Sequence, residues 1–194
     1  MKKIGVMTTG GDASGMNAAI RAAVRTAISK GAEVCGIEEG YNGLLKNKIF
    51  SMSSQSVGGI INTGGTILQT KRSKDFHDKK FRQIAYANLK KSGIEGLVVI
   101  GGDGSRMGAY LITKESGIPT AFVPGSIDND VYGTDYTIGF DTAVNTVLSA
   151  INNIRDTMTA HNRACIIEVM GRKCGDIAMY AGLTGGAEII LVPE

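Results

Sequence analysis

Residues 96–105 read Gly-Leu-Val-Val-Ile-Gly-Gly-Asp-Gly-Ser, an unbroken apolar run that ends in glycines and a carboxylate. An apolar run of this length between glycines predicts a buried strand over Leu97–Ile100. The residues that follow predict a helix over Ser105–Glu115. The segment is therefore strand, tight turn and helix, which is the repeating unit of a parallel sheet covered by helices.

The same order of elements recurs on both sides of this segment. Further strands are expected at Ile4–Thr8, Val34–Glu38, Thr120–Val123, Ala164–Val169 and Glu188–Val192. Further helices are expected at Met16–Ser29, Ser53–Asn62, Asp78–Ser92, Phe140–Ala160 and Asp176–Leu183. The pattern predicts an α/β fold with a mostly parallel sheet in a three-layer α/β/α sandwich.

The composition excludes several classes of protein. The chain has 194 residues, 43% hydrophobic and 20% charged, which is ordinary for a soluble globular protein. Its net charge is only +3 and its basic residues are scattered, so nucleic acid is not an expected partner. No apolar segment has the length of a membrane span and the start is not a signal peptide. We expect a cytoplasmic protein with no membrane contact.

The three cysteines are widely spaced and predict neither a disulfide framework nor a metal cluster. Cys35 and Cys165 fall inside expected strands. We expect both to be small buried hydrophobic residues.

Three loops follow expected strands and carry residues that suit phosphate chemistry. The first, residues 8–17, reads Thr-Thr-Gly-Gly-Asp-Ala-Ser-Gly-Met-Asn. Paired glycines let backbone N–H groups approach an anion near a helix start. A tight turn with Asp12 or Ser14 as a helix cap explains this loop equally well.

The second and third loops add carboxylates. Asp103, in the second, is a candidate ligand for Mg²⁺, which binds one or two carboxylates together with nucleotide phosphates. It could equally cap the next helix. Asp128 and Asp130, in the third, can point to one side of an extended loop. On that segment alone, a surface turn is the simpler explanation. The carboxyl ends of parallel strands share one rim, so together the loops favour phosphate transfer.

Four segments taken together resemble the 6-phosphofructokinase family. They are residues 10–17, 101–105 and 125–130, with Glu-Val-Met-Gly-Arg at 168–172, in this order and spacing. The resemblance runs from Lys3 to Glu194 and implies the amino-terminal part of such an enzyme. It implies two similar domains: an ATP and Mg²⁺ domain at residues 1–138 and an incomplete sugar-phosphate domain at 139–194. A strand at 188–192 without a covering element after it suggests that the natural sequence continues, or that something absent here closes the edge.

The resemblance implies roles for individual residues. Asp128 would be the catalytic base toward the 1-hydroxyl of fructose 6-phosphate, and Asp103 would hold Mg²⁺. Gly11 and Arg72 would stabilise the transferring phosphoryl group. The ATP-binding residues would be Gly11, Lys71, Arg72, Gly102, Asp103, Gly104 and Ser105. The sugar-phosphate residues would be Ser126, Ile127, Asp128, Asp130, Arg163, Met170, Gly171 and Arg172.

Assembly and regulation are also implied by the resemblance. Arg163 would reach the sugar phosphate of a neighbouring subunit, so a homo-oligomer, a tetramer in the family, is expected. ADP or phosphoenolpyruvate would be effectors, with Arg21, Arg25, Arg155 and Glu188 matching the family's effector site. Ser54 and Gly59 stand where Arg and Asp are typical, which implies weakened or altered control.

The phosphate donor is the last implication. Family members that use pyrophosphate carry Asp in place of Gly104 and Lys in place of Gly125, so this chain is expected to use ATP. Glycine at these positions leaves room for the α-phosphate. Arg106 departs from the family by replacing an aromatic residue, and residues 71–77 depart from the family's usual Ala-Arg-Phe-Pro-Glu-Phe-Arg. The missing aromatic and Arg put adenine or phosphate contacts there in doubt.

Two other functions stay open. The chain could be a truncated nucleotide-binding fragment that does not catalyse transfer. It could also be a kinase for another acceptor, because lipid and NAD kinases share the Gly-Gly-Asp-Gly loop, although they lack the segments around Asp128 and Arg172.

Overall fold

The computed structural model describes all 194 residues. The chain forms two compact units, Met1–Gly125 and Ser126–Glu194. Compactness does not identify which ligand each part binds, so the functional division into residues 1–138 and 139–194 stays a prediction.

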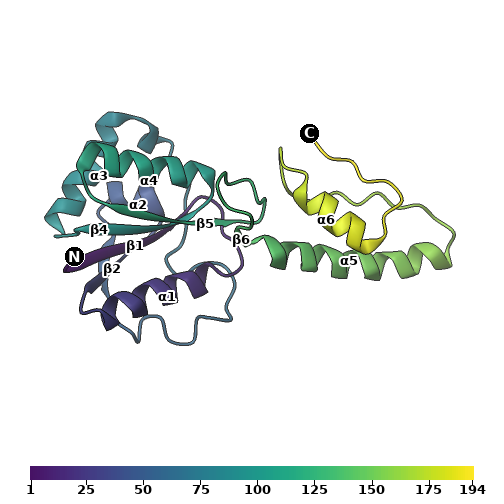
Figure 1. Cartoon of the computed structure of the whole chain (residues 1–194), viewed down its shortest axis with the longest axis horizontal. Helices are drawn as coiled ribbons and strands as arrows, with labels where there is room; N and C mark the ends of the chain where they lie inside the picture. The colour runs from purple at the N-terminus through teal and green to yellow at the C-terminus, as the bar shows by residue number, and fades with distance from the viewer. The chain divides into compact units, whose positions relative to one another are not determined.

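The first unit is built on a twisted, mostly parallel sheet (Figure 1). Its strands are β1 (Lys3–Thr9), β2 (Glu33–Ile37), β3 (Ile49–Met52), β4 (Gly96–Gly101) and β5 (Thr120–Ser126). The order across the sheet is β3-β2-β1-β4-β5. Strands β2, β1, β4 and β5 run parallel, and β3 pairs with β2 in the antiparallel direction at one edge.

Helices cover both faces of this sheet, as the sequence predicts. Helix α1 (Met16–Ser29) lies on one face, and α2 (Gly40–Leu45), α3 (Lys79–Lys91) and α4 (Asp103–Ser116) lie on the other (Figure 1). A short 3₁₀ helix, η1 (Asp75–His77), precedes α3. The three-layer α/β/α arrangement is therefore confirmed for this unit.

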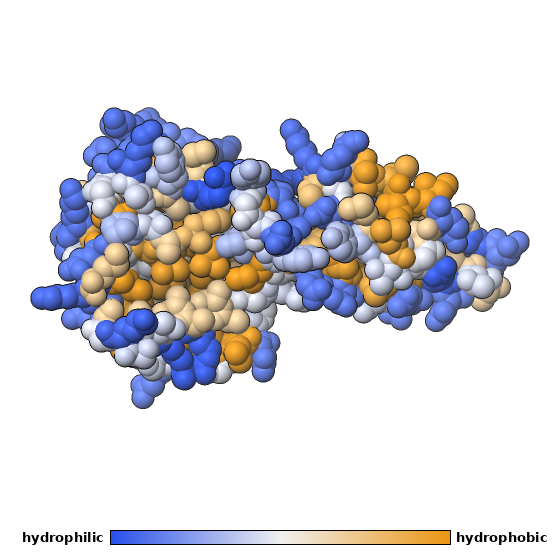
Figure 2. Space-filling view, in the orientation of Figure 1, coloured by the Kyte–Doolittle hydropathy of each residue, from blue (hydrophilic) through white to orange (hydrophobic).

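The main core lies between the sheet and the helices α2, α3 and α4. Its buried side chains include Met7, Ile37, Leu89, Val99 and Ile112. Cys35 belongs to this core, which confirms it as a small buried hydrophobic residue. The face toward α1 is less completely covered, and Figure 2 shows an apolar band on the surface of this unit.

Three features of the first unit differ from the sequence prediction. Residues 53–62 form turns and not the expected helix, so that prediction is wrong. The sequence also did not predict α2 or the antiparallel strand β3. Both are short, and β3 forms because its backbone pairs with β2.

The second unit consists of a short strand, β6 (Ile138–Gly139), and two helices, α5 (Phe140–Ala160) and α6 (Asp176–Gly185). Helix α5 has the predicted bounds, and its apolar face is half-buried against α6, where a Cβ at Gly185 would lie 3.1 Å from Ile151. None of the helices in the structure is both long and apolar enough to span a bilayer.

The expected strands at Ala164–Val169 and Glu188–Val192 are absent, so those two predictions are wrong. Both segments are exposed chain: Ile166 is 98% exposed and Leu191 is 84% exposed. Cys165 is exposed as well, contrary to expectation. An apolar run becomes a strand only when a neighbouring strand satisfies its backbone groups, and the second unit offers these segments none.

Candidate functional site

The candidate site of the first unit lies at the carboxyl ends of β1 and β4. These strands are neighbours in the sheet, with Thr9 opposite Gly101 at their ends. Helix α1 leaves β1 on one face and α4 leaves β4 on the other (Figure 1). The connections therefore diverge between these two strands, which is where open α/β sheets bind ligands.

The loop after β1 turns on glycines. Gly10 has φ 98° and Gly15 has φ 97°, a region that side chains rarely enter. Gly15 is the N-cap of α1 and no side chain caps the helix, so the idea that Asp12 or Ser14 does so is wrong. A Cβ added to Gly11 would meet no atom within 4 Å, so this glycine faces open space.

The loop after β4 lies close to the first. A Cβ at Gly101 would come within 2.3 Å of the Thr9 carbonyl oxygen, so only glycine fits. Ser105 is buried and its hydroxyl donates a hydrogen bond of 3.0 Å to that oxygen. This bond ties α4 to β1. The Ser105 side chain faces inward and its main-chain N–H donates to Gly102 O at 3.0 Å, so the amides left at the helix start are those of the residues before it.

Helix α4 begins at this loop with no side-chain cap, since Gly102 is its N-cap. Asp103 is its first residue and does not cap it. Its exposed carboxylate accepts two hydrogen bonds from Arg106, at 3.0 and 2.8 Å. A Cβ at Gly104 would meet nothing within 4 Å. The helix start thus combines free amides, a carboxylate and open space.

Lys71 and Arg72, which are expected to bind phosphate, follow a residue that is bonded to this rim. Thr70 donates a hydrogen bond of 2.9 Å to the carbonyl oxygen of Gly10. Lys71 and Arg72 follow directly, and both are exposed. Thr70, the residue before Lys71, is therefore bonded to the loop that contains Gly11, and β1 ends beside β4, which leads into residues 102–105.

Sequence reasoning missed the aromatic and ionic groups behind this rim. Tyr41 and Phe76 are stacked with ring centroids 4.1 Å apart, and the Tyr41 hydroxyl donates to Ser105 O at 2.6 Å. Burial raises the pKa of Tyr41. Nothing local in the sequence pairs residues 41 and 76, which are 35 positions apart in the chain.

An ion pair anchors the segment that follows Arg72. Arg82 donates to both carboxylate oxygens of Glu115 at 3.0 and 2.7 Å, and to the carbonyl oxygens of Phe76 and His77. The bonds from Arg82 hold the pKa of Glu115 down at about 2. Burial and then the hydrogen bond to Glu115 raise the pKa of Tyr86, whose hydroxyl donates to the same carboxylate.

The second unit gathers the expected sugar-side carboxylates around a guanidinium. Arg172 donates two hydrogen bonds of 3.3 Å to Asp128 and lies 4.0 Å from Asp130. The Ser126 hydroxyl donates to Asp130 at 3.1 Å. Only 7% of Asp128 is exposed, so it does not belong to a simple surface turn. The carboxylates of Asp128 and Asp130 both face Arg172. They thus point to one side of the loop, as their separation of two positions in the chain suggested.

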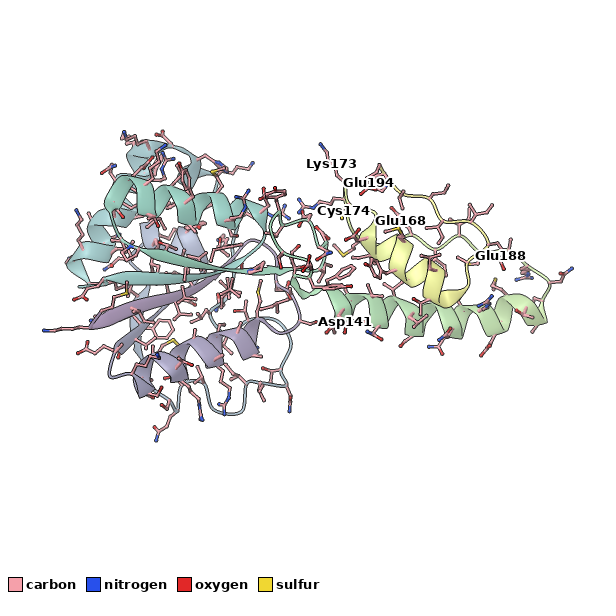
Figure 3. All side chains as sticks on the ribbon, viewed as in Figure 1. Asp141, Glu168, Lys173, Cys174, Glu188 and Glu194 are labelled. Atoms are coloured by element: carbon pink, nitrogen blue, oxygen red, sulfur yellow. The ribbon has the colours of Figure 1, made fainter.

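The backbone around Arg172 is tightly constrained. Gly171 has φ 143°, and a Cβ there would lie 2.4 Å from the Cys174 carbonyl oxygen. Asn129 donates to Asp176 at 2.7 Å, which ties the carboxylate loop to the start of α6. Met170 and Arg163, also expected to bind substrate, are exposed, and so is Glu168 (Figure 3).

The expected effector residues fall in both units. Arg21 donates to Val57 O and Arg25 is exposed in the first unit. Arg155 donates to Gly185 O and Gly186 O in the second, and Glu188 lies beyond the end of α6, remote from Cys174 (Figure 3). A joint effector site stays a prediction. So does a cleft shared by Asp103 of the first unit and Asp128 of the second.

Comparison with known proteins gives a consistent result. A family model described as Phosphofructokinase matches residues 3–194. An ATP-dependent 6-phosphofructokinase from Clostridium tetani is 61% identical over 100% of this chain and 60% of that protein. One from a Thermoanaerobacter species is 60% identical with the same coverage. The chain thus spans 60% of the length of the curated relatives it matches.

Solved structures agree. The phosphofructokinase from Saccharomyces cerevisiae superimposes with a TM-score of 0.87 at 40% identity, covering 94% of this chain and 28% of that one. A pyrophosphate-dependent phosphofructokinase from Marinobacter aquaeolei has a TM-score of 0.81 at 24% identity, covering 94% of this chain and 49% of that one. At that identity the second likeness shows the fold alone.

Proposed function

This chain belongs to the phosphofructokinase family, and from that premise we propose that its protein transfers the γ-phosphate of ATP to the 1-hydroxyl of fructose 6-phosphate. The products are fructose 1,6-bisphosphate and ADP. One observation carries the proposal. The two glycine loops follow the adjacent strands β1 and β4, and the helices after them, α1 and α4, lie on opposite faces of the sheet.

The residues of this rim suit a nucleotide triphosphate. The main chain of Gly11 and that of residues 102–104 at the start of α4 offer N–H donors to phosphate oxygens. The Ser105 N–H already donates to Gly102 O. The exposed cations of Lys71 and Arg72 follow the residue that bonds Gly10. Phosphoryl transfer depends on such positioning and charge stabilisation more than on covalent chemistry.

The donor set also suits Mg²⁺. Asp103 is an exposed carboxylate at a helix start with open space beside Gly104. Mg²⁺ prefers one or two carboxylates and phosphate oxygens to an all-protein cage, and the structure contains no cluster of three or more potential metal ligands. Asp103 would hold the ion, which would neutralise charge on the phosphates.

Asp128 is the proposed base of the second unit. Its buried carboxylate is held by Arg172 at 3.3 Å, and Ser126 and Asp130 complete the surroundings. In this proposal Asp128 takes the proton from the sugar hydroxyl while Arg172, Met170 and Gly171 bind the sugar phosphate. Ile127 lies beside the base, and Arg163 reaches the sugar phosphate bound by a neighbouring subunit.

ATP is the proposed donor in preference to pyrophosphate. Open space at Gly104 is available to the α-phosphate. Gly125 is packed, because a Cβ there would lie 3.2 Å from Met16, so a larger side chain at this position would crowd Met16. The 61% identical relative is named as ATP-dependent. We further propose a cytoplasmic homotetramer with ADP or phosphoenolpyruvate as effectors.

A direct assay tests the proposal. The purified protein is supplied with MgATP or Mg-pyrophosphate, and with fructose 6-phosphate, a diacylglycerol or NAD as acceptor, and products are identified by mass spectrometry. Fructose 1,6-bisphosphate formed from ATP supports the proposal. Transfer to another acceptor, or from pyrophosphate alone, contradicts it.

A second candidate, nucleotide binding without transfer, is favoured for the 194-residue chain by one observation. The segments 164–169 and 188–192, on the sugar side, are exposed chain without strand partners. Saturable MgATP binding by calorimetry, without product from any acceptor, would identify this function.

A further inference from the structure

Asn17 is a buried polar residue on the apolar face of α1. It is 1% exposed and lies between the fully buried Met16 and Ile20. Its amide does not bond within its own helix. Its nitrogen donates to Thr63 O at 3.1 Å and Gly64 O at 3.1 Å, and its oxygen accepts from Ile67 N at 2.8 Å.

These bonds fix an irregular segment that we call the strap, residues 63–72. The strap contains no helix or strand. Leu68 is buried and its carbonyl accepts from Glu39 N, which gives the strap one further anchor. Leaving a buried amide unpaired is unfavourable, so the Asn17 side chain and the first half of the strap hold each other in place.

The second half of the strap is bonded to the end of β1. The Thr8 hydroxyl donates to Gln69 O at 2.8 Å and lies 2.8 Å from the Thr66 hydroxyl. Thr70 then bonds Gly10 O at 2.9 Å. The strap therefore runs from α1 to the first glycine loop, and its last residues are Lys71 and Arg72.

The chain beyond the strap is anchored a second time. Arg82 holds the carbonyl oxygens of Phe76 and His77 while paired with Glu115. Lys71 and Arg72 thus lie between one anchor at Thr70 and another at Phe76. Fixed ends a few residues apart restrict where the two cationic side chains can reach.

We propose that Asn17 is a positioning residue that acts through the strap to hold Arg72 and Lys71 toward the terminal phosphates of the nucleotide. Asn17 does not itself touch the nucleotide. The inference rests on the proposed function, because the two cations matter to catalysis only if phosphates bind at this rim.

The test compares Asn17→Asp with a matched control in the intact protein. Asn17→Asp keeps the shape of the side chain but removes the donor to Thr63 and Gly64 and faces their carbonyls with negative charge. The control is Asn88→Asp, because Asn88 donates in the same way to Leu44 O at 2.8 Å but its hydrogen bonds go to α2 and not to the strap.

We expect Asn17→Asp to lower kcat/KM for MgATP by roughly 10- to 100-fold, the scale for a misplaced catalytic group. The KM for fructose 6-phosphate should change little, and Asn88→Asp should leave kcat/KM within about 3-fold of wild type, as a site apart from the strap. If Asn17 had only a structural role, its substitution would impair the kinetics toward MgATP and toward fructose 6-phosphate alike, in proportion to the lost stability.

A double-mutant cycle isolates the path through Arg72. If Asn17 acts through Arg72, the Asn17→Asp/Arg72→Ala protein should be about as impaired as Arg72→Ala alone. Additive losses would overturn the proposal. If Asn17→Asp does not fold, Thr70→Val removes the bond to Gly10 and enters the same cycle with the same two outcomes.

Hydrogen exchange separates failure of this inference from failure of the proposed function. Peptides covering residues 63–72 should exchange faster in Asn17→Asp than in wild type or Asn88→Asp, whether or not the protein is a kinase. Unchanged exchange there would overturn the inference. If exchange is faster in Asn17→Asp but the wild-type protein transfers no phosphate, the catalytic role is overturned and the error lies in the proposed function.

Discussion

Arg106 and Asp103 are joined by two hydrogen bonds to one carboxylate oxygen, from Nε at 3.0 Å and from Nη2 at 2.8 Å. The pair lies one helical turn apart at the start of α4. Asp103 is the proposed ligand of Mg²⁺. The guanidinium of Arg106 should therefore compete with Mg²⁺ for this carboxylate.

Arg106→Gln should therefore tighten Mg²⁺ binding. The pair is exposed, so its contribution is about 0.2–1 kcal/mol and the Mg²⁺ concentration for half-maximal activity should fall by roughly 1.5- to 5-fold. The measurement is activity against free Mg²⁺ at saturating ATP. Lys114→Gln, at the other end of the same helix, serves as the control and should leave that concentration unchanged. A higher Mg²⁺ requirement in Arg106→Gln would contradict the competition.

Asp128→Asn should reduce turnover by on the order of 10²–10⁴, the usual effect of removing a general base. The amide keeps the size of the side chain and an oxygen that can accept from Arg172, so the main loss is the negative charge and the basic oxygen. Asp135→Asn, an exposed carboxylate of the same unit, is the matched variant. Near-normal kcat in Asp128→Asn would remove this residue from the role of base.

Gly104→Asp should weaken ATP binding without unfolding the protein. The added Cβ meets no atom within 4 Å, so the carboxylate enters the open space beside the helix start and repels phosphate. We expect KM for ATP to rise roughly 10- to 100-fold, the effect of about 1.4–2.8 kcal/mol. Gly104→Ala is the steric control, and a similar rise with alanine would show that volume and not charge is responsible.

Glu115→Gln should make the protein less stable in a pH-dependent way. The bonds from Arg82 lower the pKa of Glu115 from 4.5 to about 2. The ionised Glu115 therefore stabilises the folded protein above pH 4.5, and this contribution is lost as the pH falls toward 2. The wild type should therefore exceed the variant by on the order of 1–3 kcal/mol near neutral pH.

Urea unfolding at several pH values measures this difference, which should shrink between pH 4.5 and 2. Glu33→Gln provides a comparison, because its pair with Lys3 is exposed and worth at most about 1 kcal/mol. A difference between wild type and Glu115→Gln that stays constant down to pH 2 would argue against the ionic origin.

Effector control should be weak. Ser54 stands where an arginine is typical and offers no guanidinium to a phosphate, and a lost charge-assisted contact costs about 1.5–3 kcal/mol. Half-maximal effects of ADP and phosphoenolpyruvate should therefore need roughly 10- to 100-fold more ligand than where an arginine is present. Activity titrations with each effector measure this, and a strong response to both would show that other groups bind them.

Strands β1, β2, β4 and β5 of the first unit could be predicted because each contains an apolar run closed by glycine or polar residues, whereas β3 could not. Leu97–Ile100 was found within one residue at each end, and Phe140–Ala160 was found with the observed bounds because its apolar positions follow the helical period. Ala164–Val169 has an equally apolar pattern and is not a strand. The difference lies in neighbouring strands, which local sequence does not reveal.

The candidate site divides in the same way. Gly11, Asp103 and Gly104 could be located because they follow recognisable strands, and the rim gathers the ends of parallel strands. Asn17 and Thr70 could not, because their partners are 46 and 60 residues away in the chain. The signal that was present was an amide on an otherwise apolar helical face.

Strand β3 at the edge of the sheet has a bearing on how the protein behaves in concentrated solution. An edge strand offers unpaired backbone groups to other molecules, and long apolar edges promote aggregation. Here the edge is only four residues long, and Lys46 and Lys48 precede it in the chain. Lys48 is paired with Glu38 at 3.6 Å and Glu39 at 2.8 Å, so the shortness of the edge, more than charge repulsion, should oppose edge-to-edge pairing, even though Phe50 is 45% exposed there.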